Sequence, residues 1–308
     1  ITLRQFSFAI GLQMFLWGLF GPWFGIVTDK YGGHVAVFIG FVFYLIGILL
    51  LYSGINKGFY FIVSMGILIG IGLGATAVSI PVSVVSKHFP SSNRTIATGI
   101  VTAAGSFGYF VSPLFTRMSL VEYGWQDTLL FFSIFVVIGL GLAFLLTTPK
   151  TTEGSVSEDK QTAMEALNEA FSNKSYNYLT LGFFVCGWHI TLVATHIPAY
   201  LNDKGLPGWC AATLLSMIGL FNIFGTLTCG YLSTKFPKKF ILSFIYFARG
   251  VVILLFIILP PSPTIAILFG ITFGFLWLAT VPPTAGMVSF IFGTKYMGLL
   301  YGIVFLSH

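Results

Sequence analysis

Nine long apolar runs constrain the fold of this chain more than any other feature. They lie at about 5–27, 34–54, 59–86, 94–117, 125–147, 178–201, 209–233, 240–259 and 264–290. A helix needs roughly 20 apolar residues to cross a bilayer core of about 30 Å. Only 8% of the residues are charged and the mean hydropathy is +0.93, so a water-soluble fold could not bury the apolar surface. The sequence predicts an all-α membrane protein.

A tenth apolar run starts near Met297 and stops at His308, which is too short to span a membrane. The first residue is Ile1 rather than methionine. We therefore expect the sequence to be a fragment that is cut at both ends. The three cysteines are odd in number and far apart, so we predict neither a disulfide framework nor a metal site, and we expect no cofactor.

A polar segment at 148–177 separates the fifth run from the sixth and carries five of the nine acidic residues. It predicts a linker between two transmembrane bundles, 1–147 and 178–308. Four of its apolar residues fall on one helical face, namely Ala163, Leu167, Ala170 and Phe171. Part of the linker is therefore expected to be a short amphipathic helix on the membrane surface, or alternatively an ordinary long loop.

Basic residues are distributed unequally between the two sides of the predicted bundle. Ten fall on one side when the loops alternate: Lys30, Lys87, Arg94, Lys150, Lys160, Lys174, Lys235, Lys238, Lys239 and Lys295. Four fall on the other: Arg4, Lys57, Arg117 and Lys204. Because cytoplasmic loops are enriched in Lys and Arg, we expect the first side, including the linker 148–177, to be cytoplasmic. The predicted location is the plasma or inner membrane.

The segment GIVTDKYGGH at 25–34 returns in altered form as GYLSTKFPKK at 230–239. Aligning Gly25 with Gly230 pairs Lys30 with Lys235 and leaves Asp29 opposite Thr234. Both segments close a predicted helix and enter a short loop. Two halves that share such a landmark indicate a duplicated bundle, which is a transporter design.

The pattern Gly25-x-x-x-Asp29-Lys30-x-Gly32 resembles the loop signature between the second and third helices of the major facilitator superfamily. The resemblance covers essentially the whole chain and implies helices two to eleven of twelve, with the last one incomplete. It departs from the family pattern at His34, where Arg or Lys is usual, and at Thr234, where Asp is expected. The fourth family helix (59–86) also lacks the charged pattern that is typical of proton-antiporting drug pumps.

A narrower resemblance is to the monocarboxylate-transporter and oxalate/formate-antiporter branch of that superfamily. It is carried by 94–99 (RTIATG), 104–106 (AGS) and Gly124-Trp125. The segments 182–201 and 302–308 are similar to prokaryotic members of the branch. The branch implies a small organic anion as substrate.

Five residues form a predicted conformational gate: Gly25, Asp29, Lys30, Gly32 and Lys235. Gly25 allows close helix contact. Asp29 follows the C-terminus of a helix, where the helix dipole disfavours a negative charge, so it needs a basic residue or the N-terminus of another helix as a partner. The resemblance implies the N-terminus of helix eleven, near Met297, in the outward-open state. Alternatively, Asp29 is a solvated loop charge that only sets topology.

No acidic residue lies in the middle of a predicted span, whereas Arg249 lies about nine residues, or roughly 14 Å, from either end of its run. An arginine at that depth is costly and must bond carbonyls, polar side chains or a substrate anion. Arg249 is therefore either an anion anchor or a structural and coupling residue. The resemblance favours the second role, because it makes this helix peripheral.

His189, His196 and Tyr200 share one face of their predicted helix, since seven residues are nearly two turns. The resemblance places this helix beside the substrate cavity. Protonated histidines could hold a carboxylate or couple a proton. The alternative is that each imidazole bonds a neighbouring carbonyl or threonine.

Weaker candidates are polar side chains within other spans. Thr76, Ser79 and Ser83 lie within one arc and either line a cavity or bond their own carbonyls. Asn222 is expected to face protein or water. Trp277 precedes Pro282-Pro283, and such a break is tolerated only beside a cavity or neighbouring protein.

Together these features predict a secondary active transporter that moves a small, monocarboxylate-like organic anion by alternating access. Its expected partners are the anion, protons or a counter-anion, and the lipid bilayer, with no nucleic acid, and we expect a monomer. The alternatives are an exporter of neutral or hydrophobic molecules and a non-transporting membrane sensor. We do not expect an enzyme, because the spans contain neither a catalytic triad nor paired carboxylates.

If Asp29 alone holds the gate, Asp29→Asn will slow transport cycling far more than Thr234→Asp. The comparison requires uptake rates of both variants at matched protein levels. Equal effects, or no effect from either, would reduce Asp29 to a topology marker.

Overall fold

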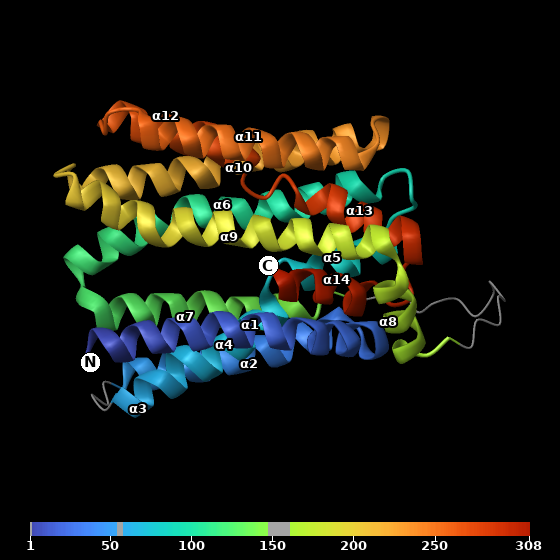
Figure 1. Ribbon diagram of the computed structural model, residues 1–308. Coiled ribbons are helices and arrows are strands. Elements are labelled where there is room, and N and C mark those ends of the chain that lie inside the picture. The colour runs from blue at the N-terminus through green and yellow to red at the C-terminus, as the bar shows by residue number, and fades with distance from the viewer. Residues whose placement is uncertain (1, 54–57, 147–160) are drawn as a thin grey trace. The chain divides into compact units, whose positions relative to one another are not determined.

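The computed structural model describes residues 2–53, 58–146 and 161–308, and all regular structure in these ranges is helical (Figure 1). Backbone groups in lipid have no water to bond, so a helix is the form in which an apolar segment satisfies them internally. The described residues contain nine helical segments that are long and apolar enough to cross a membrane. They coincide with the nine predicted runs, which confirms the all-α class.

The elements follow the chain in this order: α1 (Leu3–Tyr31), α2 (Gly33–Tyr52), α3 (Gly58–Phe61), the π-helix η1 (Ile62–Leu68), α4 (Ile69–Thr76), α5 (Ser79–His88), α6 (Arg94–Glu122), α7 (Gly124–Ala143), α8 (Ala163–Ser172), α9 (Lys174–Asp203), α10 (Gly208–Lys235), α11 (Lys238–Ile258), α12 (Pro263–Leu276), α13 (Val281–Phe292) and α14 (Met297–Ser307).

The chain forms two compact units that each combine segments from both halves of the sequence. Unit 1 comprises Ile1–His88, Ser119–Leu181 and Phe292–Ser307, and unit 2 comprises Phe89–Met118, Gly182–Ile291 and His308. Unit 1 therefore contains α14 together with α1, and unit 2 contains most of α6 together with α10. The boundaries of the two sequence halves, 1–147 and 178–308, stay a prediction.

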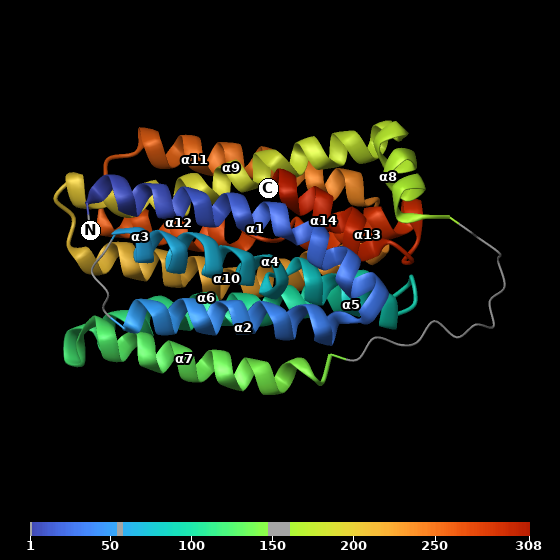
Figure 2. The same cartoon turned by 90° about the horizontal axis from the view of Figure 1, so that it is seen from below.

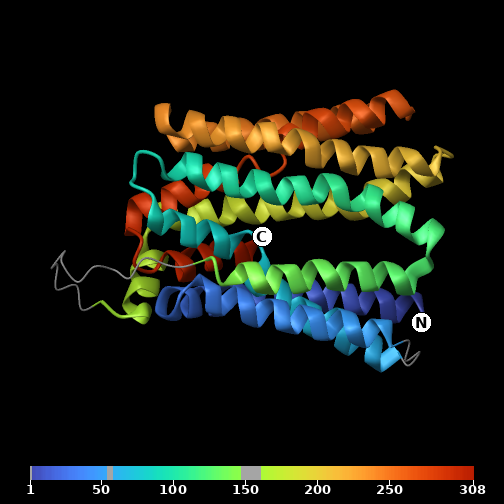
Figure 3. The same ribbon diagram turned by 180° about the vertical axis from the view of Figure 1, so that it is seen from behind.

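In unit 1, α2 packs along both α4 and α7, while α1 lies against α14 (Figures 2 and 3). Close packing needs small residues, and a Cβ atom at Gly40 would overlap the side chain of Ala75 on α4. In unit 2, α10 packs along α12. There a Cβ atom at Gly274 would lie 2.7 Å from the Cα atom of Ile218.

Two of the predicted spans are interrupted. The run at 59–86 contains η1, in which the Ser64 hydroxyl donates to the carbonyl of Gly47 on α2 at 2.6 Å. The same run is interrupted again at Ala77, which follows α4 and has a ψ of 163°. The run at 264–290 is broken between the end of α12 and the start of α13. This break begins at Trp277, before the two prolines that predicted it.

The amphipathic helix predicted in the linker is confirmed as α8. Its N-cap Thr162 accepts from the Glu165 N–H, and the Glu165 carboxylate accepts from the Thr162 N–H, which is a capping box. Ala166 and Ala170 are buried on its inner face. The rest of the linker, at 148–160, lies outside the described residues.

Candidate functional site

The carboxylate of Asp29 docks on the N-terminus of α14 within unit 1. It accepts hydrogen bonds from the N–H groups of Gly298 at 3.0 Å and Leu299 at 2.9 Å. Its third partner is the Lys87 ammonium at the end of α5, 2.5 Å away. The first N–H groups of a helix have no intrahelical acceptor, and the helix dipole adds positive potential there. Asp29 thus has both kinds of partner that the sequence required, and we call this contact the α1–α14 latch.

Gly25 lets the two helices of the latch approach closely. A Cβ atom at this position would overlap the carbonyl group of Gly298 and lie 2.9 Å from the nitrogen of Leu299. Any larger residue would therefore separate α1 from the donors that Asp29 uses. Gly25 and Asp29 are one helical turn apart, so both face α14.

The other predicted gate residues have different local roles. Gly32 has a φ of 99°, which a side chain rarely adopts, and its N–H closes α1 on the Thr28 carbonyl at 3.1 Å. Lys30 lies 5.0 Å from the ring centre of Tyr31, and in unit 2 Lys235 lies 4.6 Å from that of Tyr231. Lys30 does not join the latch. Lys87, which does, was not singled out from the sequence.

Arg249 is fully buried in unit 2, where its guanidinium bonds the break between α12 and α13. Nε donates to the Leu276 carbonyl at 3.1 Å, Nη2 donates to the same oxygen at 2.6 Å and also to the Trp277 carbonyl, and Nη1 lies 3.0 Å from the Cys186 sulfur. The break frees these carbonyls from helical bonding, and the arginine satisfies them. Of the partners that the sequence left open, carbonyls are the ones found.

Asn222 holds the same break from α10. Its amide nitrogen donates to the Ser106 hydroxyl at 2.7 Å, and its amide oxygen accepts from the Leu278 N–H at 2.8 Å. Asn222 therefore faces protein, as predicted. Trp277 is also buried and packs against Tyr109 and Phe273. Side chains of Arg249 and Asn222 thus bond both carbonyl and N–H groups of the break.

The two predicted histidines of α9 have different environments. His196 is exposed, whereas His189 is half-buried and its Nδ1 atom has no hydrogen-bond partner among the described residues. Tyr200 is half-buried, with its ring centre 5.9 Å from that of Phe256. The helix continues through Pro198 to Asp203.

The hydroxyls predicted near α4 mostly bond their own helices. Thr76 donates to the Gly72 carbonyl at 2.9 Å and Ser83 donates to the Ile80 carbonyl at 2.8 Å. Ser79 is buried. The sequence left two roles open, bonding to carbonyls of the same helix and lining a cavity. Thr76 and Ser83 have the first role, and Thr76 also has the second.

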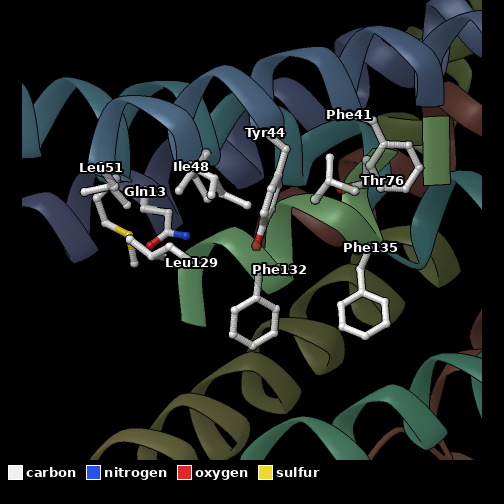
Figure 4. A pocket seen from close by; sticks show the side chains of 12 residues that line it. Gln13, Phe41, Tyr44, Ile48, Leu51, Thr76, Leu129, Phe132 and Phe135 are labelled. Atoms are coloured by element: carbon white, nitrogen blue, oxygen red, sulfur yellow. The ribbon is translucent and has the colours of Figure 1, made fainter. Parts of the chain in front are cut away.

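That cavity lies inside unit 1 and has a volume of about 370 Å³ (Figure 4). Its polar groups come from Gln13, Tyr44 and Thr76. Most of its wall is apolar and includes the rings of Phe41 and Phe132. Sequence analysis did not identify this cavity, because its lining comes from four separate helical segments.

No group of three or more His, Cys, Asp or Glu side chains in the described part of the chain could hold a metal ion. The sole ion pair within hydrogen-bonding range among the same residues is that of Lys87 with Asp29.

Comparison with known protein families gives a match over the whole chain. The model of the Major Facilitator Superfamily matches residues 1–308. The chain is 24% identical to the MFS transporter asaE of Aspergillus flavus, over 99% of this chain and 68% of that protein. It is 26% identical to the sialic acid transporter NanX of Escherichia coli, with 92% and 70% covered, and 23% identical to monocarboxylate transporter 12-B of Danio rerio, with 94% and 67% covered.

Solved structures share the fold at low sequence identity. The Escherichia coli fucose:proton symporter FucP matches with a TM-score of 0.74 at 15% identity, over 99% of this chain and 81% of that one. The human organic anion transporter MFSD10 matches with a TM-score of 0.68 at 15% identity, over 98% and 75%. Both similarities concern the fold alone.

Arg249→Met tests whether the buried arginine is structural. The substitution leaves the Leu276 and Trp277 carbonyls unsatisfied, at a cost of about 1–3 kcal/mol each. We expect the midpoint of thermal unfolding in detergent to fall by at least about 4 °C. The matched control is Arg117→Met, because Arg117 is exposed near the end of α6. An unchanged midpoint together with lost substrate binding would instead make Arg249 a substrate anchor.

Proposed function

The chain belongs to the Major Facilitator Superfamily, and from that membership we propose that it is a secondary active transporter of a small organic anion of the monocarboxylate type. Membership supports a multi-pass membrane transporter of small molecules. The proposal adds the charge of the substrate and the groups that bind it.

The distribution of ionisable groups favours an anion. All nine acidic residues lie at the ends of the spans or in the linker, whereas Arg249, His189 and His196 lie within spans. Ionisable groups inside a membrane are costly and tend to mark substrate or ion pathways. Two relatives have names that concern acidic substrates: a sialic acid transporter and a monocarboxylate transporter.

The observation that carries the proposal is the unpartnered Nδ1 of His189. A buried polar atom without a hydrogen bond costs free energy, so a ligand that bonds it gains affinity. A carboxylate would accept a hydrogen bond from this nitrogen when it is protonated. The charge of the buried Arg249 on α11 adds positive potential for the same anion, although its N–H groups already serve the α12–α13 break.

Alternating access requires contacts that form in one state and break in another, and the α1–α14 latch is suited to this. Its donors are the backbone N–H groups of Gly298 and Leu299, which water can replace when the helices separate. We propose that Asp29, Gly25 and Lys87 form the gate. Gly32 ends the helix that carries it, and Lys30 and Lys235 set the charge of the flanking loops.

We place the protein in the plasma or inner membrane, with the linker 148–177 on the cytoplasmic side. The excess of basic residues on that side supports this orientation. His189 and His196 are the groups that could couple a proton to transport, because a neutral imidazole has a ring nitrogen that can accept a proton. Exchange against a counter-anion is the other way to drive an anion carrier. We expect a monomer.

A second candidate function is the export of a neutral or hydrophobic molecule. The cavity in unit 1 favours it, because its wall is mostly aromatic and aliphatic and its polar groups are an amide and hydroxyls. Such a wall suits an apolar ligand. The same cavity offers no cation for a carboxylate.

Counterflow in proteoliposomes tests the proposal. The full chain is expected to exchange labelled lactate, pyruvate, formate or oxalate against the unlabelled anion. His189→Ala should lower the rate about tenfold or more, because it removes a hydrogen bond to a charged group. His196→Ala reports whether the exposed histidine contributes as well. Normal counterflow in both variants, or exchange of neutral analogues only, would overturn the anion assignment.

A further inference from the structure

A small basic hollow in unit 2 lies where α6 begins. It has a volume of about 190 Å³ and is lined by Ser91, Arg94, Thr95, Lys238, Gly286, Ser289 and Phe290. These residues come from the N-terminus of α6, the first turn of α11 and the second half of α13. Two cations and three hydroxyls therefore converge from three separate elements.

This hollow is the counterpart of the α1–α14 latch. In the latch, Gly25 meets the backbone of Gly298 on α14. In unit 2, its repeat partner Gly230 meets the backbone of Thr95 on α6, where a Cβ atom would lie 2.8 Å from the Thr95 carbonyl oxygen. The same glycine therefore lies against the start of a helix in both places. Thr95 of α6 corresponds to Gly298 of α14.

The chemistry of the two places is opposite. Asp29, four residues after Gly25, provides the carboxylate of the latch, whereas Thr234, four residues after Gly230, has none and donates to the Tyr231 carbonyl. The residue eight positions after Gly25 is Gly33, whereas the residue eight positions after Gly230 is Lys238. The counterpart of the latch has lost its internal anion and gained a cation.

The Lys238 side chain reaches the hollow by crossing Gly286. A Cβ atom on Gly286 would lie 2.8 Å from Cε and 3.2 Å from Cδ of this lysine, so only glycine leaves room for it. In the first unit, the matching contact is made by Gly33 with Val84. The aliphatic part of the Lys238 side chain thus lies where unit 1 has the side chain of Val84.

One buried donor of the hollow lacks a partner. The Nε atom of Arg94 is buried and has no hydrogen bond among the described residues. Thr95 is only 4% exposed, and the Ser289 hydroxyl donates to the Gly286 carbonyl at 3.3 Å. Neither Arg94 nor Lys238 has a carboxylate within 4.0 Å in the described part of the chain. A buried donor without an acceptor is costly, so the Nε atom of Arg94 favours the binding of an acceptor that carries negative charge.

We propose that this hollow binds a phosphate-class oxyanion, which takes the place that a carboxylate has in the latch. Arg94 and Lys238 provide charge, and Ser91 and Thr95 provide hydroxyl donors. A helix N-terminus favours anions, and α6 begins at Arg94. Donors that converge from three elements match the several oxygens of a tetrahedral anion better than the two of a carboxylate.

Binding there ties α6 to α11 and α13 through one anion. The anion therefore stabilises this part of unit 2 as Asp29 stabilises its counterpart in unit 1. The inference does not depend on which substrate the protein transports. The phosphate group comes either from free phosphate or from the headgroup of an anionic phospholipid, and Phe290, 85% exposed at the edge of the hollow, leaves it open to either source.

Isothermal titration of the purified full chain with inorganic phosphate, at constant ionic strength, tests the site. A second arm measures binding of a short-chain phosphatidic acid below its micelle concentration. Lys238→Gln is expected to weaken binding about tenfold, because it removes a charged donor. The matched control is Lys239→Gln, since Lys239 is the next residue, lies against the Phe240 ring and does not line the hollow. This control should bind as the unchanged protein does.

Thr234→Asp supplies the complementary test. It restores a carboxylate at the position that corresponds to Asp29, so phosphate binding should be lost while the thermal midpoint does not fall. Binding of the lipid alone would assign the phosphate group to a headgroup, and binding of both would assign it to either source. Equal affinities of Lys238→Gln and Lys239→Gln, or no binding in either arm, would overturn the proposal.

Discussion

A charge can be buried among lipid-facing helices only if polar groups replace the water it has lost. The chain meets this constraint at two charges, and in both cases the partners are mainly backbone groups at helix ends. Asp29 takes the unpaired N–H groups that begin α14, and Arg249 takes the carbonyls that are freed where α12 ends. Breaks and termini of helices are thus the places where this membrane protein can hold charge.

The same constraint applies to the α1–α14 latch and to its counterpart in unit 2, which differ in charge. Each is a close contact of a glycine with the start of a helix, Gly25 with α14 and Gly230 with α6. One crossing contains its own carboxylate and a lysine to neutralise it. The other contains two cations and no carboxylate among the described residues. We propose that the first switches with the transport cycle by itself, whereas the second depends on an anion from outside the chain.

Much of the architecture could be predicted from the sequence, because lipid leaves few alternatives for an apolar run of 20 residues. The spans, the linker helix and the presence of a break in the run at 264–290 followed from hydropathy, periodicity and the double proline, although the break begins at Trp277 and the prolines lie within α13. The π-helix η1 did not, and its Ser64 hydroxyl bonds the carbonyl of Gly47, which lies 17 residues away on another helix. The partners of the buried charges could not be predicted from the sequence either, because they are distant along the chain. Lys87 is 58 residues from Asp29, and Arg249 reaches carbonyls 27 and 28 residues away.

The central claim is that the contact of Asp29 with α14 is a reversible latch. Double electron–electron resonance between spin labels at Tyr31, the end of α1, and Thr294, just before α14, measures it directly. In the unchanged protein the account predicts a short-distance population, which Asp29→Asn converts mainly to longer distances. The control Asp127→Asn, at an exposed carboxylate near the start of α7, should leave the distribution as it is. Identical distributions with and without the Asp29 carboxylate would contradict the account.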